Sequence, residues 1–192
     1  MQSKITWIRT SVVCILGTFL IACEPEFEEP FRVYLIPQGK QSSTSNLQTL
    51  QSNTLRFEAM FDYTAIYQTK DEINQHDINK LYGFSDCNSS HHENSARFGW
   101  RWLEGRLEIF AYTYVNGDRI SEYICSVPLG QIVQYEISFN EHFYFFQVEG
   151  YETIKIERGD SCTRGLYYRL FPYFGGDEVA PHDIAIRIRN IY

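Results

Sequence analysis

Two neighbouring runs of the sequence place charged and phenolic side chains at alternating positions. In residues 96–102 and 106–115, apolar residues alternate with polar ones, the pattern of strands that bury one face. The side chains of the other face that could do chemistry are Arg97, Arg101, Glu108, Tyr112 and Tyr114. A hairpin at 103–105 would bring them to one face, turned out into water. Guanidinium and carboxylate groups bond sugar hydroxyls and phenol rings stack on sugar C–H faces, so this face is a predicted carbohydrate-binding surface.

The same side chains suggest a catalytic alternative. A lyase that cleaves an acidic glycan needs a cation to neutralise the uronate carboxylate, and a base and an acid to move protons. Arg97 or Arg101 would supply the cation. The candidates for proton transfer are Tyr112, Tyr114, His91 and His92. The competing interpretation is structural: the arginines pair with Glu108 and the tyrosines cover a sheet face.

Two polar loops hold further candidates. The loop 85–94 contains Asp86, His91, His92 and Glu93, whose atoms suit zinc and whose oxygens alone suit calcium. It lacks both a repeated Cys/His spacing and the residue order of a calcium loop, so a surface loop that caps turns is the alternative. No cofactor is therefore predicted. In the loop 175–183, His182 is a candidate ligand-binding residue, although a simple connection between strands explains the same composition.

The start of the chain resembles a bacterial lipoprotein export signal. Two basic residues precede an apolar run of about 11 residues, too short to cross a bilayer but suited to a cleaved signal peptide. The run ends in Leu20-Ile21-Ala22-Cys23, which is similar to a lipobox. The resemblance implies removal of residues 1–22 and acylation of Cys23. Residues 23–30 then form an acidic tether of the kind that sends some lipoproteins to the cell surface, so the predicted location is the outer membrane, lipid-anchored.

The net charge and the length of the chain after the signal limit its partners and its number of domains. Removing the signal lowers the count of basic residues from 17 to 15 and leaves all 24 acidic ones, a net charge of −9. That balance argues against a nucleic-acid partner, which requires clustered lysine and arginine. Residues 31–192 have the length of one domain, and neither a repeat nor an internal linker divides them.

Three cysteines follow Cys23: Cys87, Cys125 and Cys162. An exported protein can form a disulfide, which here would leave one odd thiol. Cys87 and Cys162 lie in polar, loop-like surroundings, whereas Cys125 lies in a strand-like run, so Cys87–Cys162 is the favoured pair. Three free thiols are the open alternative, because spacing alone does not decide pairing.

Short alternating runs continue from end to end, with turn residues between them. They predict strands at 31–36, 55–61, 78–84, 96–102, 106–115, 119–127, 132–139, 142–148, 153–157, 166–171 and 184–191. Asn116-Gly117 is the strongest hairpin signal. The stretch 41–53 is a predicted loop, and 68–77 has room for one helical turn. Hairpin-linked strands without helices between them predict an all-β fold, an antiparallel two-sheet sandwich or jelly roll.

The aromatic-rich strings give this fold a family resemblance. Ala96-Arg97-Phe98-Gly99-Trp100-Arg101-Trp102 and Gly105-Arg106-Leu107-Glu108-Ile109-Phe110-Ala111-Tyr112 resemble paired strands of concanavalin A-like jelly rolls, polysaccharide-lyase-like or laminin G-like. Phe171-Pro172-Tyr173-Phe174-Gly175-Gly176, followed by Ala180-Pro181-His182-Asp183, is similar to a segment before the last strand of that group. The group includes lectins, glycan hydrolases, lyases and laminin G-like binding modules. The Glu-x-Asp-x-x-Glu string of its glucanases and the Arg-x-Glu-Leu-Arg and Gln-Ile-His strings of its alginate lyases are absent.

Three functional hypotheses follow. The first is a lectin-like, carbohydrate-binding lipoprotein of the cell envelope, with a glycan and the membrane as its partners; it needs no catalytic string. The second is a polysaccharide lyase or another glycan-degrading enzyme of the same fold. The third is a structural or adhesive surface module. Binding is favoured over catalysis because the catalytic sequence motifs of the glucanases and alginate lyases are missing.

Overall fold

The computed structural model describes residues 29–159, 162 and 164–192, which form two stacked antiparallel sheets. The predicted signal peptide, Cys23 and most of the predicted tether lie outside these residues. Within the described ranges, no helix has the length and apolar character needed to cross a lipid bilayer.

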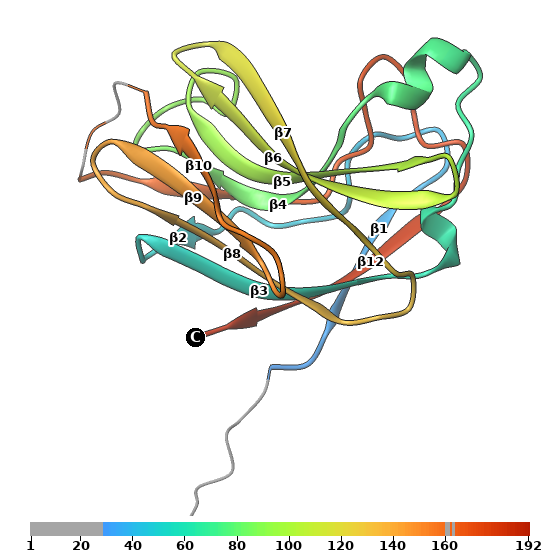
Figure 1. Ribbon diagram of the computed structural model, residues 1–192, viewed down its shortest axis with the longest axis horizontal. Helices are drawn as coiled ribbons and strands as arrows, with labels where there is room; N and C mark the ends of the chain where they lie inside the picture. Colours follow the sequence, from blue (N-terminus) through green and yellow to red (C-terminus); the bar gives the residue numbers. More distant parts are fainter. Residues whose placement is uncertain (1–28, 160–161, 163) are drawn as a thin grey trace, which may run out of the picture.

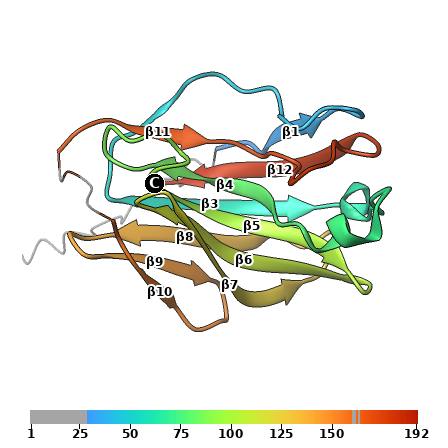
Figure 2. The same ribbon diagram turned by 90° about the horizontal axis from the view of Figure 1, so that it is seen from above.

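Each sheet has six strands (Figure 1). The first sheet has the order β1-β12-β3-β8-β9-β10, with bounds Arg32–Ile36, Ile184–Ile191, Thr54–Phe61, Val133–Phe139, Phe143–Val148 and Ile154–Glu157. The second has the order β2-β11-β4-β5-β6-β7, with bounds Thr49–Leu50, Tyr167–Leu170, Asn79–Ser85, Ser95–Leu103, Arg106–Val115 and Asp118–Val127. Figure 2 shows β11, β4, β5, β6 and β7 side by side across the second sheet.

Turn residues fix the register of the central hairpins. Asn116 and Gly117 have φ angles of 53° and 89°, the left-handed pair that a two-residue hairpin requires. Glu104 and Gly105, between β5 and β6, have φ angles of 50° and 75°. The two predicted hairpins are therefore present, and they place β5, β6 and β7 next to one another.

The strand predictions agree with the structure apart from one short addition. The two-residue β2 lies inside the predicted loop 41–53 and pairs only with β11. Two residues are too few to show alternation, which explains the omission. The predicted helical turn in 68–77 is the 3₁₀ helix η2 (Glu72–His76), and a second, η1, spans Tyr63–Ala65.

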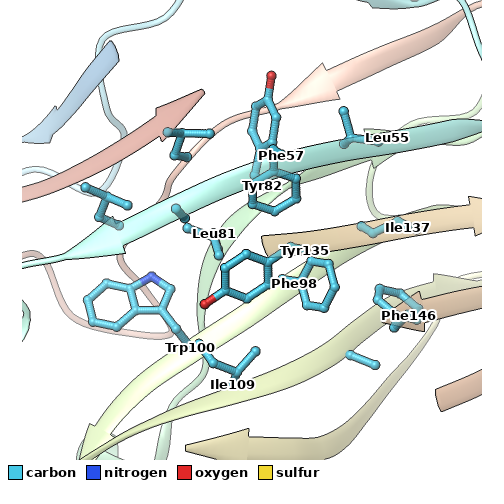
Figure 3. Close-up of a cluster of buried hydrophobic side chains, with 14 of the residues drawn as sticks. Leu55, Phe57, Leu81, Tyr82, Phe98, Trp100, Ile109, Tyr135, Ile137 and Phe146 are labelled. Atoms are coloured by element: carbon cyan, nitrogen blue, oxygen red, sulfur yellow. The ribbon is translucent and has the colours of Figure 1, made fainter. Parts of the chain in front are cut away.

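Aromatic side chains fill the space between the sheets (Figure 3). Phe57 stacks on Tyr135 with ring centroids 5.2 Å apart, and Phe98 meets both rings edge-on. Trp100 is fully buried against Phe61. Because the core takes Phe98, Trp100, Ile109 and Ala111, the alternate residues of β5 and β6 point away from the first sheet.

Candidate functional site

The five predicted site residues of β5 and β6 lie on the outer face of the second sheet, the face turned away from the first sheet. Arg97 is directly opposite Tyr112, and Arg101 is directly opposite Glu108. Tyr114 follows Tyr112 on the same side of β6, and the two rings are 6.0 Å apart. The predicted convergence of guanidinium, carboxylate and phenol groups on one face is therefore present.

The expectation that these groups stand out in water is wrong for three of the five, whereas Arg101 and Tyr114 are partly exposed. Only 6% of Arg97, 6% of Glu108 and 2% of Tyr112 is exposed. Neighbouring side chains pack on them: Lys80 and Arg97 lie near the Tyr112 ring, and Arg101 pairs with Glu108. Alternation identifies the face of a strand, but not the side chains that pack on it.

Arg101 and Glu108 form a structural pair. The Arg101 Nε lies 2.7 Å from Glu108 Oε2, and its Nη1 donates to the His76 carbonyl at 2.8 Å. The Arg101 guanidinium also sits 4.9 Å from the Phe110 ring centroid. With its donors occupied, Arg101 is held in place by the protein, as the structural interpretation of the sequence anticipates for this arginine.

Arg97 differs from Arg101 because it has no carboxylate partner among the described residues. Its side chain crosses Gly83 of β4, where a Cβ atom would lie 2.7 Å from Arg97 Cγ, so the glycine leaves room for it. The Nε of Arg97 is buried without a hydrogen-bond partner, and its guanidinium lies 5.5 Å from the Tyr112 ring centroid. Burial lowers the pKa of Arg97, although the group remains a cation at neutral pH.

Lys80 of β4 joins Arg97 on this face. Its Nζ donates to the Gly175 carbonyl at 2.8 Å and lies 5.1 Å from the Tyr112 ring centroid and 5.9 Å from that of Tyr173. Burial, followed by repulsion from Arg97, lowers the pKa of Lys80 to about 8. We call Lys80, Arg97, Tyr112, Tyr114 and Tyr173 the cationic cluster.

The sequence did not reveal Lys80 and Tyr173 as part of this face. A register shift between Lys80 and Gly83 breaks the alternation of β4, so parity gave no usable signal there. Tyr173 belongs to an irregular segment that reaches β4 only through isolated bridges. An exposed arginine, Arg119 of β7, lies opposite Tyr114 and adds positive charge at the edge of the cluster.

At one end of the cationic cluster, two histidines adjoin its tyrosines. Burial, together with the neighbouring Tyr114, raises the pKa of Tyr112 to about 12. The His92 ring lies 5.3 Å from Tyr114 and 4.1 Å from the His91 ring. Burial and the charge of Arg97 lower the pKa of His91, so its imidazole is neutral at pH 7. Of the proton-transfer candidates, His92 therefore lies beside Tyr114, and His91 lies beside His92.

The four residues predicted as metal ligands do not form a common site. The Asp86 carboxylate is bonded to Arg158 and Tyr144 between the sheets, whereas His91 and His92 are exposed. Burial alone raises the pKa of Asp86, but the hydrogen bonds from Arg158 and Tyr144 outweigh it and hold the pKa below its ordinary value. Among the described residues, no group of three or more His, Cys, Asp or Glu side chains is placed to hold a metal ion.

His182 lies away from the cationic cluster. Its Nε2 is 2.9 Å from the Thr64 carbonyl, and it lines a pocket of about 720 Å³ together with His76 and Trp102. The structure also contains a disulfide between Cys87 and Cys162, while Cys125 is a buried free cysteine.

Comparisons with known proteins identify the fold but not a family. No protein-family model and no curated protein sequence matches the chain. Among solved structures, the alginate lyase AlyC3 superposes with a TM-score of 0.56 at 10% identity, over 82% of this chain and 72% of that one. A structure described with endo-acting O-glycanases of the human gut microbiota superposes with a TM-score of 0.54 at 12% identity, over 84% and 79%.

A third similar structure is the alginate lyase from Klebsiella pneumoniae. Its TM-score is 0.51 at 13% identity, over 70% of this chain, and the chain spans only 56% of the length of that enzyme. At such identities the likeness concerns the fold alone. Together with the two antiparallel sheets, it confirms the predicted fold class: the chain is an all-β sandwich of the concanavalin A-like jelly-roll type.

Proposed function

We propose that the chain binds an acidic glycan through the cationic cluster on the outer face of its second sheet. The observation that carries this proposal is Arg97, a cationic residue that is only 6% exposed and lacks a carboxylate partner within the described part of the chain. Burying a charge without a counter-ion is costly, so such a group is retained where a ligand supplies the opposite charge. A uronate carboxylate has that charge and a planar shape that matches the guanidinium fork.

Local charge supports an anionic ligand over a neutral one. The protein as a whole carries a formal charge of −7, yet Lys80, Arg97 and Arg119 gather on this face without an ion pair to a described carboxylate. The partly exposed phenol rings of Tyr114 and Tyr173 lie beside them and suit the C–H faces of sugar rings. The similarly folded proteins include alginate lyases, which agrees with a polysaccharide as the ligand. The predicted lipid anchor at Cys23 would hold this site at the cell envelope.

Replacing Arg97 with glutamine should weaken binding of oligouronates by about ten- to one-hundredfold, the value of one charge-assisted hydrogen bond. Isothermal titration calorimetry with oligouronates, and with neutral oligosaccharides of equal length, measures the effect. Arg56→Gln is the matched control, since Arg56 lies on β3 of the other sheet in an exposed pair with Glu136. Unchanged affinity in the folded Arg97→Gln protein, or equal binding of neutral sugars, would contradict the proposal.

Binding of an acidic glycan should also weaken as the pH rises through about 8. Lys80 has its pKa near that value, so it loses its positive charge there, while Arg97 keeps its own. Calorimetry from about pH 7 to about pH 9 should show falling affinity in the native protein. In the Lys80→Gln variant the affinity should be lower at neutral pH and nearly constant over the same range; a slope that persists in this variant would rule out Lys80 as its source.

A second candidate function is β-elimination of an acidic glycan. It is favoured by the phenols of Tyr112 and Tyr114 and the neutral imidazole of His91 beside a carboxylate-binding cation, because a lyase needs a neutralising cation, a base and an acid. Ultraviolet absorbance of the unsaturated product during incubation with uronate polymers tests it. Binding without absorbance change supports the binding protein; product formation that is lost in Tyr112→Phe while binding persists, and that is kept in Tyr168→Phe, would support the enzyme. Absence of both activities in the native protein would leave the structural or adhesive module.

A further inference from the structure

A second cation-lined pocket opens between the edge strands of the two sheets. It has a volume of about 570 Å³ and lies where β1 and β12 of the first sheet face β11 and the start of β2 in the second. Figure 1 shows the C-terminus near the start of the described chain, and both line this pocket. Its principal side chains are Arg32, Tyr34, Gln48, Arg169, Arg189 and Tyr192. It shares none of its lining residues with the cationic cluster.

Arg169 is the centre of the argument. Its Nη1 donates to the Tyr82 hydroxyl at 3.1 Å and to Asn190 Oδ1 at 3.0 Å, which fixes the guanidinium between the sheets. Its Nε is buried and has no hydrogen-bond partner, and Arg169 forms no ion pair with a described carboxylate. Nη1 of this guanidinium is thus held by the protein, while Nε has no acceptor among the described residues. The edge of a guanidinium formed by Nε and Nη2 can bind a carboxylate or phosphate through two parallel hydrogen bonds.

The other arginines of the pocket add positive charge. Arg189 is paired with Glu58 and lies 4.8 Å from the Phe31 ring centroid, so its position is fixed. Arg32 is exposed, and burial raises the pKa of the Tyr34 phenol even though the positive charge of Arg32 opposes the rise. Glu29 is the carboxylate that lines the pocket. Arg32, Arg169 and Arg189 therefore line the same pocket as Glu29.

We propose that this pocket is an oxyanion-binding site, which takes a small ligand through a carboxylate or a phosphate group. Arg169 would bind two oxygens of that group, and Arg32 would approach it from the pocket rim. The volume falls within the range of about 300–1,000 Å³ that is usual for small-molecule sites, so the anionic group can carry a body the size of one sugar ring. Arg, Tyr and Gln side chains supply hydrogen bonds for such a body.

Nuclear magnetic resonance of the full chain tests this site directly. Arginine Nε–H resonances are followed during separate titrations with inorganic phosphate, glucose phosphate and glucuronate, with glucose as the neutral probe. The Arg169 Nε–H resonance should shift with at least one of the anions and remain in place with glucose. A response to phosphates alone identifies a phosphate ligand, and a response to glucuronate alone identifies a carboxylate ligand.

Variants separate the pocket from general charge effects. Arg169→Gln should weaken the response at least about tenfold, and Arg32→Gln, an exposed position that does not hold the sheets together, should weaken it by a smaller factor. Arg106→Gln, an exposed arginine at the β5–β6 turn, should change nothing. No shift of Arg169 at millimolar anion, or an equal loss in Arg106→Gln, would overturn the proposal. Arg97→Gln should leave this titration unchanged, so the two sites fail or succeed independently.

Discussion

Replacing Asp86 with alanine is expected to lower the free energy of unfolding by about 3–5 kcal/mol, because it leaves a buried guanidinium without its counter-ion. Asp86 follows β4 of the second sheet, and Arg158 follows β10 of the first. Nη2 and Nε of Arg158 each lie 2.7 Å from one Asp86 oxygen, and both side chains are almost completely buried. The Tyr144 hydroxyl donates to the same carboxylate. The pair joins the two sheets, and urea denaturation measures its loss.

An exposed ion pair provides the control for this prediction. Glu136 pairs with Arg56 at 2.5 Å, but Arg56 is 51% exposed, so Glu136→Ala should cost no more than about 1 kcal/mol. Both variants remove a carboxylate from an arginine, and they differ chiefly in burial. If the two losses in unfolding free energy were equal, the Asp86–Arg158 pair would have no special role in joining the sheets.

The double variant Cys87→Ser, Cys162→Ser should lose about 4 kcal/mol of unfolding free energy through the unfolded state alone. The disulfide joins residues 75 positions apart, and opening so long a loop gives the unfolded chain much conformational freedom. The disulfide also holds a backbone acceptor beside Arg158, because the Cys162 carbonyl accepts a hydrogen bond from Arg158 at 3.0 Å. Thermal and urea denaturation of the native and variant proteins measure the difference.

Reduction of the native protein supplies the control for the disulfide. A thiol reductant should bring the native protein to the stability of the double variant and leave the variant itself unchanged. A variant as stable as the oxidised protein would show that the 87–162 link contributes nothing. Because Arg158 contacts both Asp86 and Cys162, combining the double variant with Asp86→Ala should give a loss that differs from the sum of the separate losses.

Local signals in the sequence were sufficient for the strands. The hairpin at Asn116-Gly117 follows from backbone conformations that few residues adopt, and the alternation in 96–102 and 106–115 sorts the core side from the outer side. These signals act between residues near each other in the chain, so they can be recognised without knowing the fold. The register of β5 with β6, and with it the Arg97–Tyr112 pairing, follows from the turn at 103–105.

The partners of the charged groups were not open to prediction in the same way. Asp86 has the composition of a metal ligand in its loop, yet its carboxylate binds Arg158, 72 positions away. Arg97 and Arg101 occupy similar positions in the sequence. Only the hydrogen bond to His76 and the register opposite Glu108 distinguish Arg101, which has a carboxylate partner, from Arg97, which has none among the described residues. Such pairings depend on how distant loops and sheets pack, which alternation does not encode.

The unpaired Cys125 has a consequence for the covalent uniformity of the molecule. Thiol–disulfide exchange requires a thiolate that can reach a sulfur of the bridge. Burial raises the pKa of Cys125 to about 11, so its sulfur stays protonated at neutral pH, and its side chain is almost inaccessible. The odd number of cysteines in the described part of the chain therefore does not lead to exchange among Cys87, Cys125 and Cys162 once the chain has folded.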